Sequence, residues 1–245
     1  MKKYFAKAFL GLCALGTSTV AFAQDAAAPA VESGMHQALK TKFIEGGADF
    51  MSLVAIALIF GLAFCLERII YLNLAETNSS KLLKGIEEAL DKGDVDAAKA
   101  IARDTRGPIA SIAYQGLMRI DQGVDVVERS IVSYGGVQGG LLEKNLSWVT
   151  LFIAMAPSLG FLGTVVGMIM AFDKIEQVGD ISPTVVAGGM KVALITTVGG
   201  LIVALILQIF YNYLLSKLES LLNQMEDASI SLIDLVIKYN LKFKK

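Results

Sequence analysis

The chain has 245 residues, of which 54% are hydrophobic and only 18% are charged, and its mean hydropathy is +0.58. Soluble domains carry roughly 25% charged residues, so this composition predicts an integral membrane protein. The formal net charge of −1 provides no general attraction to nucleic acid, and one histidine with two separated cysteines offers neither a zinc ligand set nor a disulfide framework.

The first 23 residues have the pattern of a secretory signal peptide. Lys2, Lys3 and Lys7 precede an apolar run that ends in Ala21-Phe22-Ala23, a small-x-small cleavage pattern. An uncleaved anchor is the alternative, although the run is too short to cross a bilayer comfortably. Residues 24–49 are then expected to form an exported, periplasmic N-terminal tail.

Three apolar stretches, at residues 50–72, 148–172 and 185–215, are each long enough to form a transmembrane helix. Residues 73–147, between the first two stretches, are polar with helical periodicity and predict a helical domain. Residues 173–184 form only a short connection, so the second and third helices must be antiparallel neighbours. The predicted fold is all-α, with three transmembrane helices and long cytoplasmic helical extensions.

Local signals divide residues 73–147 into several helices. Asp94 is placed to cap a helix that begins at Val95, and Gly107-Pro108 marks a break between helices. A further helix is expected to begin near Val124 and to run through Trp148 into the second span as one long rod. The pairs at 135–136 and 139–140 are candidate glycine kinks. Beyond the third span, residues 216–245 predict an amphipathic C-terminal helix.

Lysine and arginine predict the orientation. They are frequent in residues 73–147 and 216–245, whereas the short connection carries only Lys174. Positively charged loops stay in the cytoplasm, so both larger polar pieces are expected there and the mature N-terminus in the periplasm. This topology, together with the export signal, predicts a multi-pass protein of a cell inner membrane with its C-terminus in the cytoplasm.

The spans contain few groups that can titrate. Residues 148–172 have no Asp, Glu, Lys, Arg or His, and the third span has only Lys191, near its outer end. These two helices cannot supply a carboxylate relay, so an ionisable group for ion movement must come from a partner helix.

The first span ends with the adjacent pair Glu67 and Arg68. Neighbours in sequence point in different directions on a helix, so the two are expected not to pair with each other. One of them is a candidate for a polar contact with another helix or subunit. The alternative is that both reach the lipid headgroups beside Tyr71.

Small side chains recur at helical spacing in the second and third spans. One helix face carries Pro157, Gly160, Thr164, Gly167 and Ala171, and the next helix carries Ala193, Thr197, Gly200 and Ala204. Such faces allow close helix packing in lipid, and each holds one hydroxyl that can bond water or a carboxylic acid.

Two simpler interpretations of these residues remain open. The threonines can bond back to carbonyls of their own helix, and the Gly163-x-x-x-Gly167 pattern can serve helix association alone. Thr196 lies on an adjacent face and is the weaker candidate.

At these residues the sequence resembles the MotA/TolQ/ExbB proton-channel family. The similarity covers the spans and is weak in residues 73–147; its most specific part is the run APSLGFLGT from Ala156 to Thr164. The runs ERIIYL (67–72) and ALITTVGGLIVALILQIFYN (193–212) are also similar. Three spans and an exported tail are more similar to the ExbB and TolQ branches, ExbB above all, than to four-span MotA subunits.

The resemblance implies a non-enzymatic channel subunit that forms a ring of five copies, with the second and third spans around a central pore. It implies that the pore holds the helices of two ExbD-type subunits, whose aspartate exchanges protons while facing Thr164 and Thr197. It also implies coupling to a TonB-like protein that energises outer-membrane import. In ExbB-type members a glutamate lies five residues before the second threonine; here that position is Val192, so this acidic site is not carried over, and Lys191 receives no proton-transfer role.

Three other functions match part of the same pattern. A TolQ-like subunit of the Tol-Pal envelope system shares the same features. A passive oligomeric scaffold needs only the small-residue packing. An intramembrane hydrolase with Ser158 as nucleophile lacks a base in the membrane, because His36, the single histidine, lies in the predicted exported tail. No cofactor or metal is expected.

Overall fold

The structure is a computed structural model that describes residues 35–179 and 183–243. The chain divides into two compact units, residues 1–43 and 44–245. Helix α2 (Met35–Glu45) begins in the first unit and ends two residues into the second. The predicted signal peptide and residues 24–34 of the predicted tail lie outside the described residues.

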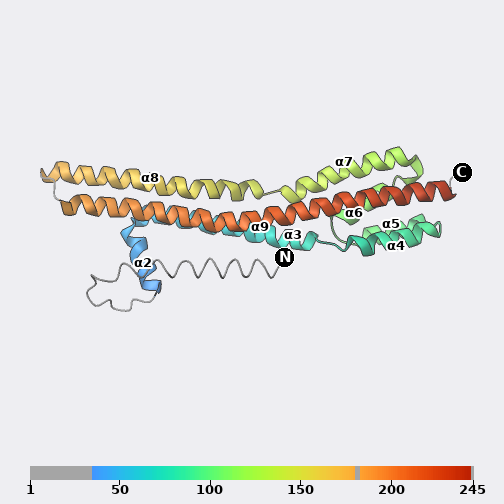
Figure 1. The fold of residues 1–245 in the computed structure, drawn as a ribbon, viewed down its shortest axis with the longest axis horizontal. Helices are drawn as coiled ribbons and strands as arrows, with labels where there is room; N and C mark the ends of the chain where they lie inside the picture. Colours follow the sequence, from blue (N-terminus) through green and yellow to red (C-terminus); the bar gives the residue numbers. More distant parts are fainter. Residues whose placement is uncertain (1–34, 180–182, 244–245) are drawn as a thin grey trace, which may run out of the picture. The chain divides into compact units, whose positions relative to one another are not determined.

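Three long helices dominate the second unit: α3 (Ala48–Ala75), α8 (Leu146–Val178) and α9 (Pro183–Phe243). Each belongs to a helical stretch that is long and apolar enough to cross a membrane, as the three predicted spans require. Helices α8 and α9 lie side by side, and α3 packs against both (Figure 1). The chain is therefore an all-helical, multi-pass membrane protein.

The turn between α8 and α9 is shorter than the predicted connection of residues 173–184. Helix α8 continues to Val178 and ends at Gly179, which has a φ of 72° in the left-handed region where glycine carries no steric penalty. Pro183 then begins α9, a position at which its missing N–H costs no helical hydrogen bond. Residues 180–182 lie outside the described range.

Helices α7 (Val124–Glu143) and α8 do not form the expected continuous rod. The helix is interrupted at Lys144 and Asn145, and Asn145 has a left-handed φ of 67°. Asparagine tolerates this conformation better than most residues with a side chain. The candidate glycine kinks are not the break, because all four glycines lie within α7. The predicted start of this helix is confirmed, since α7 begins at Val124.

The polar helical domain consists of α4 (Ser79–Asp91), α5 (Val95–Asp104), α6 (Pro108–Leu117), the 3-10 turn η1 (Ile120–Gln122) and α7. The predicted cap is confirmed, since the Asp94 carboxylate accepts a hydrogen bond of 2.9 Å from the Ala97 N–H. The predicted break is also confirmed: Gly107 has a φ of 114° and Pro108 begins α6.

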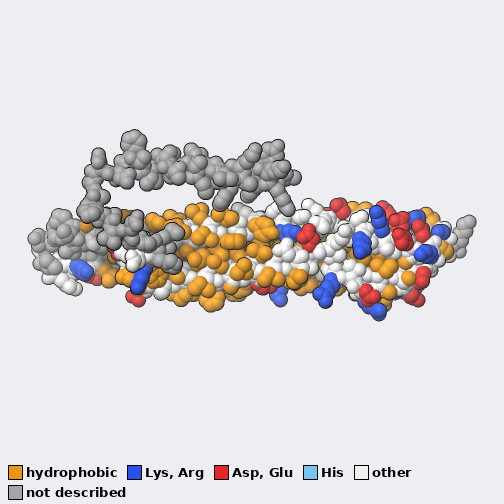
Figure 2. Space-filling model, turned by 90° about the horizontal axis from the view of Figure 1, so that it is seen from below, with side chains coloured by type: hydrophobic (Ala, Val, Ile, Leu, Met, Phe, Trp, Pro, Cys, Tyr) orange, Lys and Arg blue, Asp and Glu red, His pale blue; other side chains and the backbone are white. Residues whose placement is uncertain are grey.

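These helices pack against the second half of α9. Its buried side chains follow a spacing of three or four residues typical of a coiled-coil seam: Leu214, Leu218, Leu221, Met225, Ala228, Leu232 and Val236. Glu219, Asn223 and Glu226 are exposed, so the predicted amphipathic helix is confirmed. On the surface, hydrophobic side chains gather along one stretch of the long helices, and most charged side chains lie over the remaining stretch (Figure 2).

Aromatic rings join α3 to the beginning of α8. Phe64 stacks on Trp148 with 5.8 Å between ring centroids, and on Phe152 with 6.0 Å. Phe60 stacks on Phe152 in turn. Such contacts add to the burial of apolar area, and they fix α3 beside the first two turns of α8.

Candidate functional site

Helices α8 and α9 approach so closely that glycine is required at the contact. A Cβ atom on Gly200 would lie 2.5 Å from the Ala156 carbonyl oxygen, and one on Gly160 would lie 2.9 Å from that of Thr196. Both distances are shorter than carbon–oxygen van der Waals contact. Close backbone approach replaces the hydrophobic effect as a source of helix association in lipid.

Two threonine hydroxyls meet across this contact. Thr164 of α8 and Thr197 of α9 are within hydrogen-bonding contact of each other through their Oγ1 atoms. Both side chains are half-buried. Each lies on the small-residue face that the sequence predicts, and those two faces pack against each other.

The two hydroxyls also share the same two backbone acceptors. Thr164 Oγ1 lies 3.1 Å from the Ala193 carbonyl oxygen and 3.2 Å from that of Gly160. Thr197 Oγ1 lies 3.3 Å and 3.4 Å from the same two oxygens. Each hydroxyl therefore lies within hydrogen-bonding distance of a carbonyl oxygen of its own helix, as anticipated, and of one across the interface.

This arrangement can change its hydrogen bonds without moving atoms far. A hydroxyl has one proton to donate and two lone pairs to accept with, so two protons serve more acceptors than they can satisfy at once. Rotation of either O–H directs its proton to the other helix, to its own helix or to the other hydroxyl. The pair can thus donate to a carboxylate or accept from a carboxylic acid or water, whichever a neighbour presents.

Thr196 has a different position, which the sequence did not reveal. It is fully buried, its hydroxyl donates to the Ala193 carbonyl at 2.8 Å, and it packs against Gly163. A Cβ on Gly163 would lie 2.9 Å from the Thr196 side chain. Gly163 was the residue in the sequence that could have indicated this buried position, because a glycine within a packed helix often accommodates a larger side chain on the facing helix.

The remaining small residues complete the α8–α9 interface. Gly167 lies against Ala193, whose side chain is buried, and a Cβ on Gly167 would be 3.3 Å from it. Ala171 is buried and Pro157 is half-buried within α8. Because proline has no N–H, the Ile153 carbonyl loses its partner four residues along, which favours a local bend.

The sequence prediction for Glu67 and Arg68 was wrong in one respect and met in another. They do pair with each other: Arg68 Nε donates to Glu67 Oε2 at 2.7 Å, because the long arginine side chain folds back along α3. Arg68 is only 3% exposed rather than extended into headgroups, and its guanidinium lies 4.5 Å from the Tyr71 ring centroid.

The expected contacts with another helix are also present. Arg68 Nη1 lies 3.5 Å from the Leu141 carbonyl oxygen of α7, and Asn145 Nδ2 lies 3.4 Å from Glu67 Oε2. The pair therefore connects α3 to the end of α7 and to Asn145 at the α7–α8 break.

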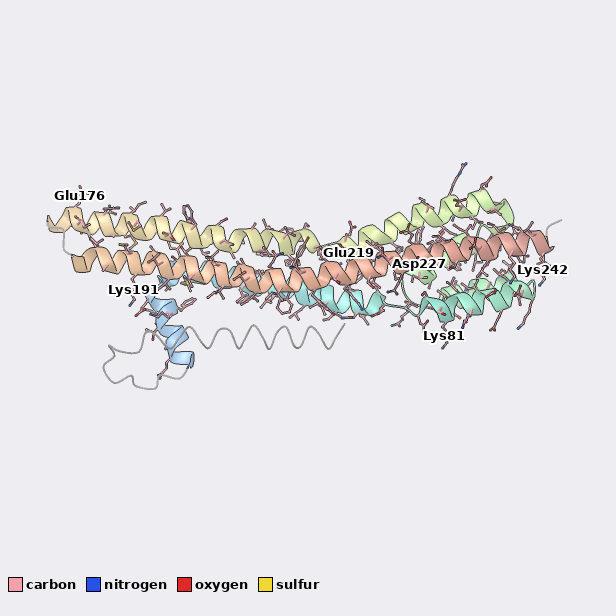
Figure 3. The ribbon with its side chains drawn as sticks, viewed as in Figure 1. Lys81, Glu176, Lys191, Glu219, Asp227 and Lys242 are labelled. Atoms are coloured by element: carbon pink, nitrogen blue, oxygen red, sulfur yellow. The ribbon has the colours of Figure 1, made fainter. Side chains whose placement is uncertain are left out.

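Charged side chains lie toward the two ends of the long helices. Glu176 and Lys191 lie near one end, whereas Glu219, Asp227, Lys81 and Lys242 lie over the other half (Figure 3). Lys191 pairs with Glu45, with 2.9 Å between Nζ and Oε1. Among residues 35–179 and 183–243, no group of three or more His, Cys, Asp or Glu side chains could hold a metal ion.

A helical membrane protein whose two long apolar helices pack through glycines and bring two hydroxyls together has the features expected of a channel or transport subunit. Comparison with known proteins identifies which one: residues 104–227 match the MotA/TolQ/ExbB proton channel family, and the chain belongs to that family. The resemblance noted in the sequence is thus confirmed, as is the expectation of a non-enzymatic channel protein.

Named relatives belong to the ExbB branch. The chain is 28% identical over 185 residues to a putative biopolymer transport protein ExbB homolog of Methanothermobacter thermautotrophicus, covering 75% of this chain and 65% of that protein. It is 37% identical over 89 residues to biopolymer transport protein exbB1 of Vibrio cholerae (33% of this chain, 39% of that protein). It is 36% identical over 78 residues to biopolymer transport protein ExbB of Aquifex aeolicus (32% and 53%). The chain thus matches less than two thirds of the length of each of these relatives.

Proposed function

We propose that this chain is the channel-forming subunit of an inner-membrane motor driven by the proton motive force. In this proposal, five copies form a ring around the single-span helices of two ExbD-type subunits. The motor energises outer-membrane import through a TonB-like protein, in keeping with the ExbB relatives, which are named as biopolymer transport proteins. The mature N-terminus is periplasmic and both polar helical pieces are cytoplasmic.

The observation that carries this proposal is the threonine pair. Thr164 of α8 and Thr197 of α9 bring two hydroxyls together where these membrane helices meet. The second predicted span, residues 148–172, contains no titratable side chain. The pair can exchange hydrogen bonds but cannot bind a proton and keep it at neutral pH. A partner carboxyl group that does bind protons supplies what the pair lacks.

The coupling follows from the difference between the two forms of such a carboxyl group. The ionised form accepts hydrogen bonds from both hydroxyls, whereas the protonated form also donates one. In a low-dielectric site a hydrogen bond to the charged form is the stronger of the two. Protonation of the partner carboxylate therefore weakens its hydrogen bonds to one threonine pair and lets the partner helix move toward the next copy in the ring.

A passive scaffold is the competing proposal. Its support is that both hydroxyls already bond to carbonyl oxygens within the chain, so the threonines have a structural use without any partner. A TolQ-like subunit of the Tol-Pal system is the alternative within the same family, with the same channel and a different envelope partner.

The test is to purify the chain from its native membrane in mild detergent and to measure the intact complex by native mass spectrometry. We expect a ring of this chain with a small single-span protein whose span contains an aspartate. The same complex in liposomes should take up protons when a membrane potential is applied. A ring recovered without any such partner, and with no proton uptake, would support the scaffold and overturn the motor.

A further inference from the structure

We propose that the polar helical domain binds the phosphate group of a small soluble molecule in a cavity between α6 and α7, with Arg119 as its principal cation. The inference goes beyond the proposed function, because it requires neither the ring nor the partner helices. It rests on a guanidinium that the described chain leaves without a counter-ion, and on a cavity whose described lining contains no carboxylate.

The α6–α7 cavity has a volume of about 320 Å³. Small-molecule pockets in proteins begin at roughly 300 Å³, so this one has room for a phosphate group and for part of the molecule that carries it. Its polar side chains are two guanidinium groups, three hydroxyls and one amide: Arg119, Arg129, Ser130, Ser133, Tyr134 and Gln115. Such a lining offers hydrogen-bond donors to an anion and no negative charge to repel it.

Arg119 follows the last turn of α6 and is held by neutral groups. Its Nη1 donates to Ser130 Oγ at 2.6 Å and to Gln115 Oε1 at 3.1 Å, and it lies 3.3 Å from the Gln115 carbonyl oxygen. In the described chain the ion pairs that involve an arginine are those of Arg68 and Arg103, so Arg119 has none there. The Arg119 side chain is nevertheless half-buried.

This arrangement fixes the Arg119 guanidinium and leaves one of its edges available. Arginine stays ionised in proteins, and a partly buried charge is costly unless an opposite charge meets it. The hydrogen bonds of its side chain all use Nη1, and none is found from Nε or Nη2 among residues 35–179 and 183–243. Those two nitrogens form the edge that donates two parallel hydrogen bonds to a phosphate group.

Helix α7 presents the other donors at helical spacing. Ser133 and Tyr134 follow Ser130 by three and four residues, so the three hydroxyls lie on one side of the helix. Val126 and Val137 also line the cavity, and they are 37% and 55% exposed. With the tyrosine ring they supply apolar surface for the body of a ligand. We therefore expect a phosphate ester to bind more tightly than inorganic phosphate.

Nearby carboxylates limit what Arg129 contributes. Asp125 and Glu128 line a second cavity, of about 430 Å³, which includes Arg129 but not Arg119. Asp121 lies in η1, two residues after Arg119, and lines neither cavity. Carboxylates beside Arg129 offset the attraction of its charge for an anion. Arg119 is therefore the principal cation of the site, and Arg129 is an auxiliary one.

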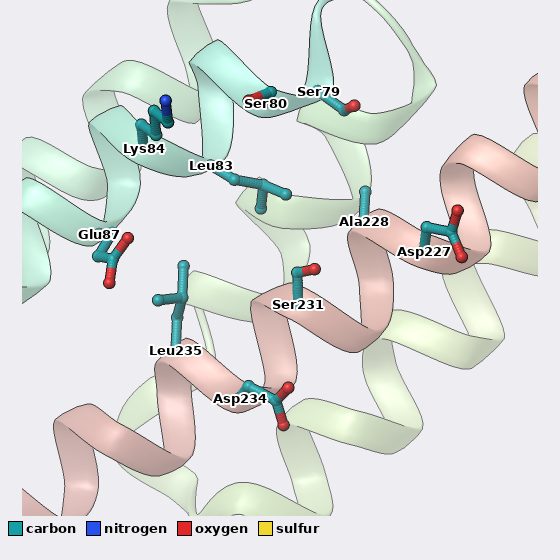
Figure 4. Close-up of a pocket in the computed structure, with 10 residues that line it drawn as sticks. All are labelled: Ser79, Ser80, Leu83, Lys84, Glu87, Asp227, Ala228, Ser231, Asp234 and Leu235. Carbon is teal, nitrogen blue, oxygen red and sulfur yellow. The ribbon is translucent and has the colours of Figure 1, made fainter.

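A larger groove in the same domain shows that size alone does not select the site. The groove between α4 and α9 has a volume of about 480 Å³ (Figure 4). Its described charged lining consists of Glu87, Asp227 and Asp234 with Lys84 as the single cation. Three carboxylates against one ammonium repel a phosphate group. Lys84 is therefore the matched control for Arg119, since both are cations beside a cavity of this domain.

The position along α7 favours a dissolved ligand over a lipid headgroup. Ser133 lies ten residues before Glu143, the last residue of α7, which is roughly 15 Å along the helix. The second predicted span begins beyond that end, at Trp148. A lipid phosphate lies at the membrane boundary, so it does not extend to the α6–α7 cavity. The expected ligand is a soluble phosphate ester.

The experiment is isothermal titration calorimetry on the full chain, purified in mild detergent with the partners that remain bound. The probes are AMP, a phosphate ester with an aromatic body, and inorganic phosphate, each titrated at constant ionic strength. AMP should bind with a Kd below about 1 mM and more tightly than inorganic phosphate. Adenosine, which has the same body without the phosphate group, should not bind.

Variants then assign the binding to the cavity. Arg119→Met should raise the Kd for AMP by about tenfold or more, because hydrogen bonds to a charged group are about twice as strong as neutral ones. Arg119→Lys keeps the charge but lacks the two-bond edge, so it should cause a smaller loss. Lys84→Met should leave the Kd unchanged. Glu128→Gln should lower the Kd, because it removes a negative charge beside Arg129.

A thermal melt without ligand accompanies each titration, because Arg119→Met also removes bonds that join α6 to α7. If this variant melts much earlier than the parent, Ser133→Ala replaces it as the test. That change removes an exposed hydroxyl, and it should raise the Kd for AMP by about threefold.

Three outcomes overturn the site. Absence of binding by both AMP and inorganic phosphate, as when a carboxylate of a second copy fills the cavity, excludes the soluble ligand. Binding that neither Arg119→Met nor Ser133→Ala weakens places the ligand elsewhere. Short-chain phosphatidylglycerol that binds through Arg119 while AMP does not assigns the cavity to lipid. Native mass spectrometry of the same samples is independent of these results: a ring with its single-span partner but without AMP binding leaves the proposed function in place.

Discussion

The hydroxyls of Thr164 and Thr197 depend on the same two carbonyl groups, those of Gly160 and Ala193, although the threonines belong to different membrane helices. Whatever rotates one hydroxyl changes the acceptors left to the other. A carboxyl group or water molecule that forms a hydrogen bond with one threonine therefore alters the hydrogen bonding of both helices at their closest contact.

Thr164→Val and Thr197→Val are expected to abolish this exchange while keeping nearly the same shape. If the pair serves a partner carboxylate, proton uptake by the reconstituted complex should fall by about tenfold or more, because a hydrogen bond to a charged group is worth about 1.5–3 kcal/mol. Thr164→Ser and Thr197→Ser retain the hydroxyl and should keep most of the uptake. Valine variants that transport as well as the parent would favour the passive scaffold.

Gly200→Ala is expected to loosen the α8–α9 hairpin. Its Cβ would lie 2.5 Å from the Ala156 carbonyl oxygen, which is backbone and cannot rotate away. Overpacking of this kind costs about 1–3 kcal/mol, so the detergent-solubilised protein should unfold several degrees earlier in a thermal melt. Gly188→Ala is the matched control on the same helix, because its Cβ meets nothing within 4 Å. Equal melting temperatures for the two variants would contradict the close approach.

Arg68→Met should weaken the connection between α3 and the α7–α8 break. Methionine fills much of the volume but removes the Glu67 pair, the bond to the Leu141 carbonyl and the contact with Tyr71. A loss of about 1–3 kcal/mol is expected, discounted because Glu67 is partly exposed to solvent. Hydrogen exchange at residues 141–148 should accelerate. The exposed Arg106→Met should leave that exchange unchanged; if both variants behave alike, Arg68 has no special role at the break.

Lys238 should titrate above the ordinary lysine value of 10.5, because hydrogen bonds from its ammonium to the Glu87 and Asp91 carboxylates raise its pKa. A raised pKa in the folded state means that the contribution to stability is complete below the unfolded value and is lost as the pH rises through the folded value. Loss of the Lys238 proton in strongly alkaline solution should therefore loosen the link between α9 and α4.

The Lys238 titration can be followed by NMR of labelled lysine side chains. Glu87→Gln should lower the Lys238 midpoint toward the ordinary lysine value of 10.5. A midpoint at or below that value in the parent protein would show that these carboxylates do not hold the ammonium.

Signals that depend on neighbours in sequence predicted the structure well. Asp94 caps α5, Gly107-Pro108 separates α5 from α6, and α7 begins at Val124, because caps, positive φ values and proline act within one turn of helix. The three apolar stretches likewise lie within the three long helices, since about 20 apolar residues in a row are enough for a helix to cross the hydrocarbon core.

Features that depend on distant residues were harder to predict. The spacing of Thr164 and Thr197 indicated two small-residue faces but not that these faces would meet. The α7–α8 break rests on a left-handed Asn145 held near Glu67, and no residue beside it is a proline or glycine. Arg68 pairs with its own neighbour because its buried side chain is long enough to reach the Glu67 carboxylate, a contact that helical spacing alone does not predict.

Helix α9 continues without interruption for 61 residues, from the apolar hairpin to the end of the polar domain. At 1.5 Å per residue it is roughly 90 Å long, so one degree of tilt at its apolar end displaces the far end by about 1.6 Å. Its neighbour α8 is separated from α7 by the break at Asn145, so α7 and α8 do not form one continuous helix of this length. The chain thus places one uninterrupted helix beside a pair of helices that is interrupted at Asn145, so a tilt of α9 at its apolar end would be carried to the far end of the polar domain.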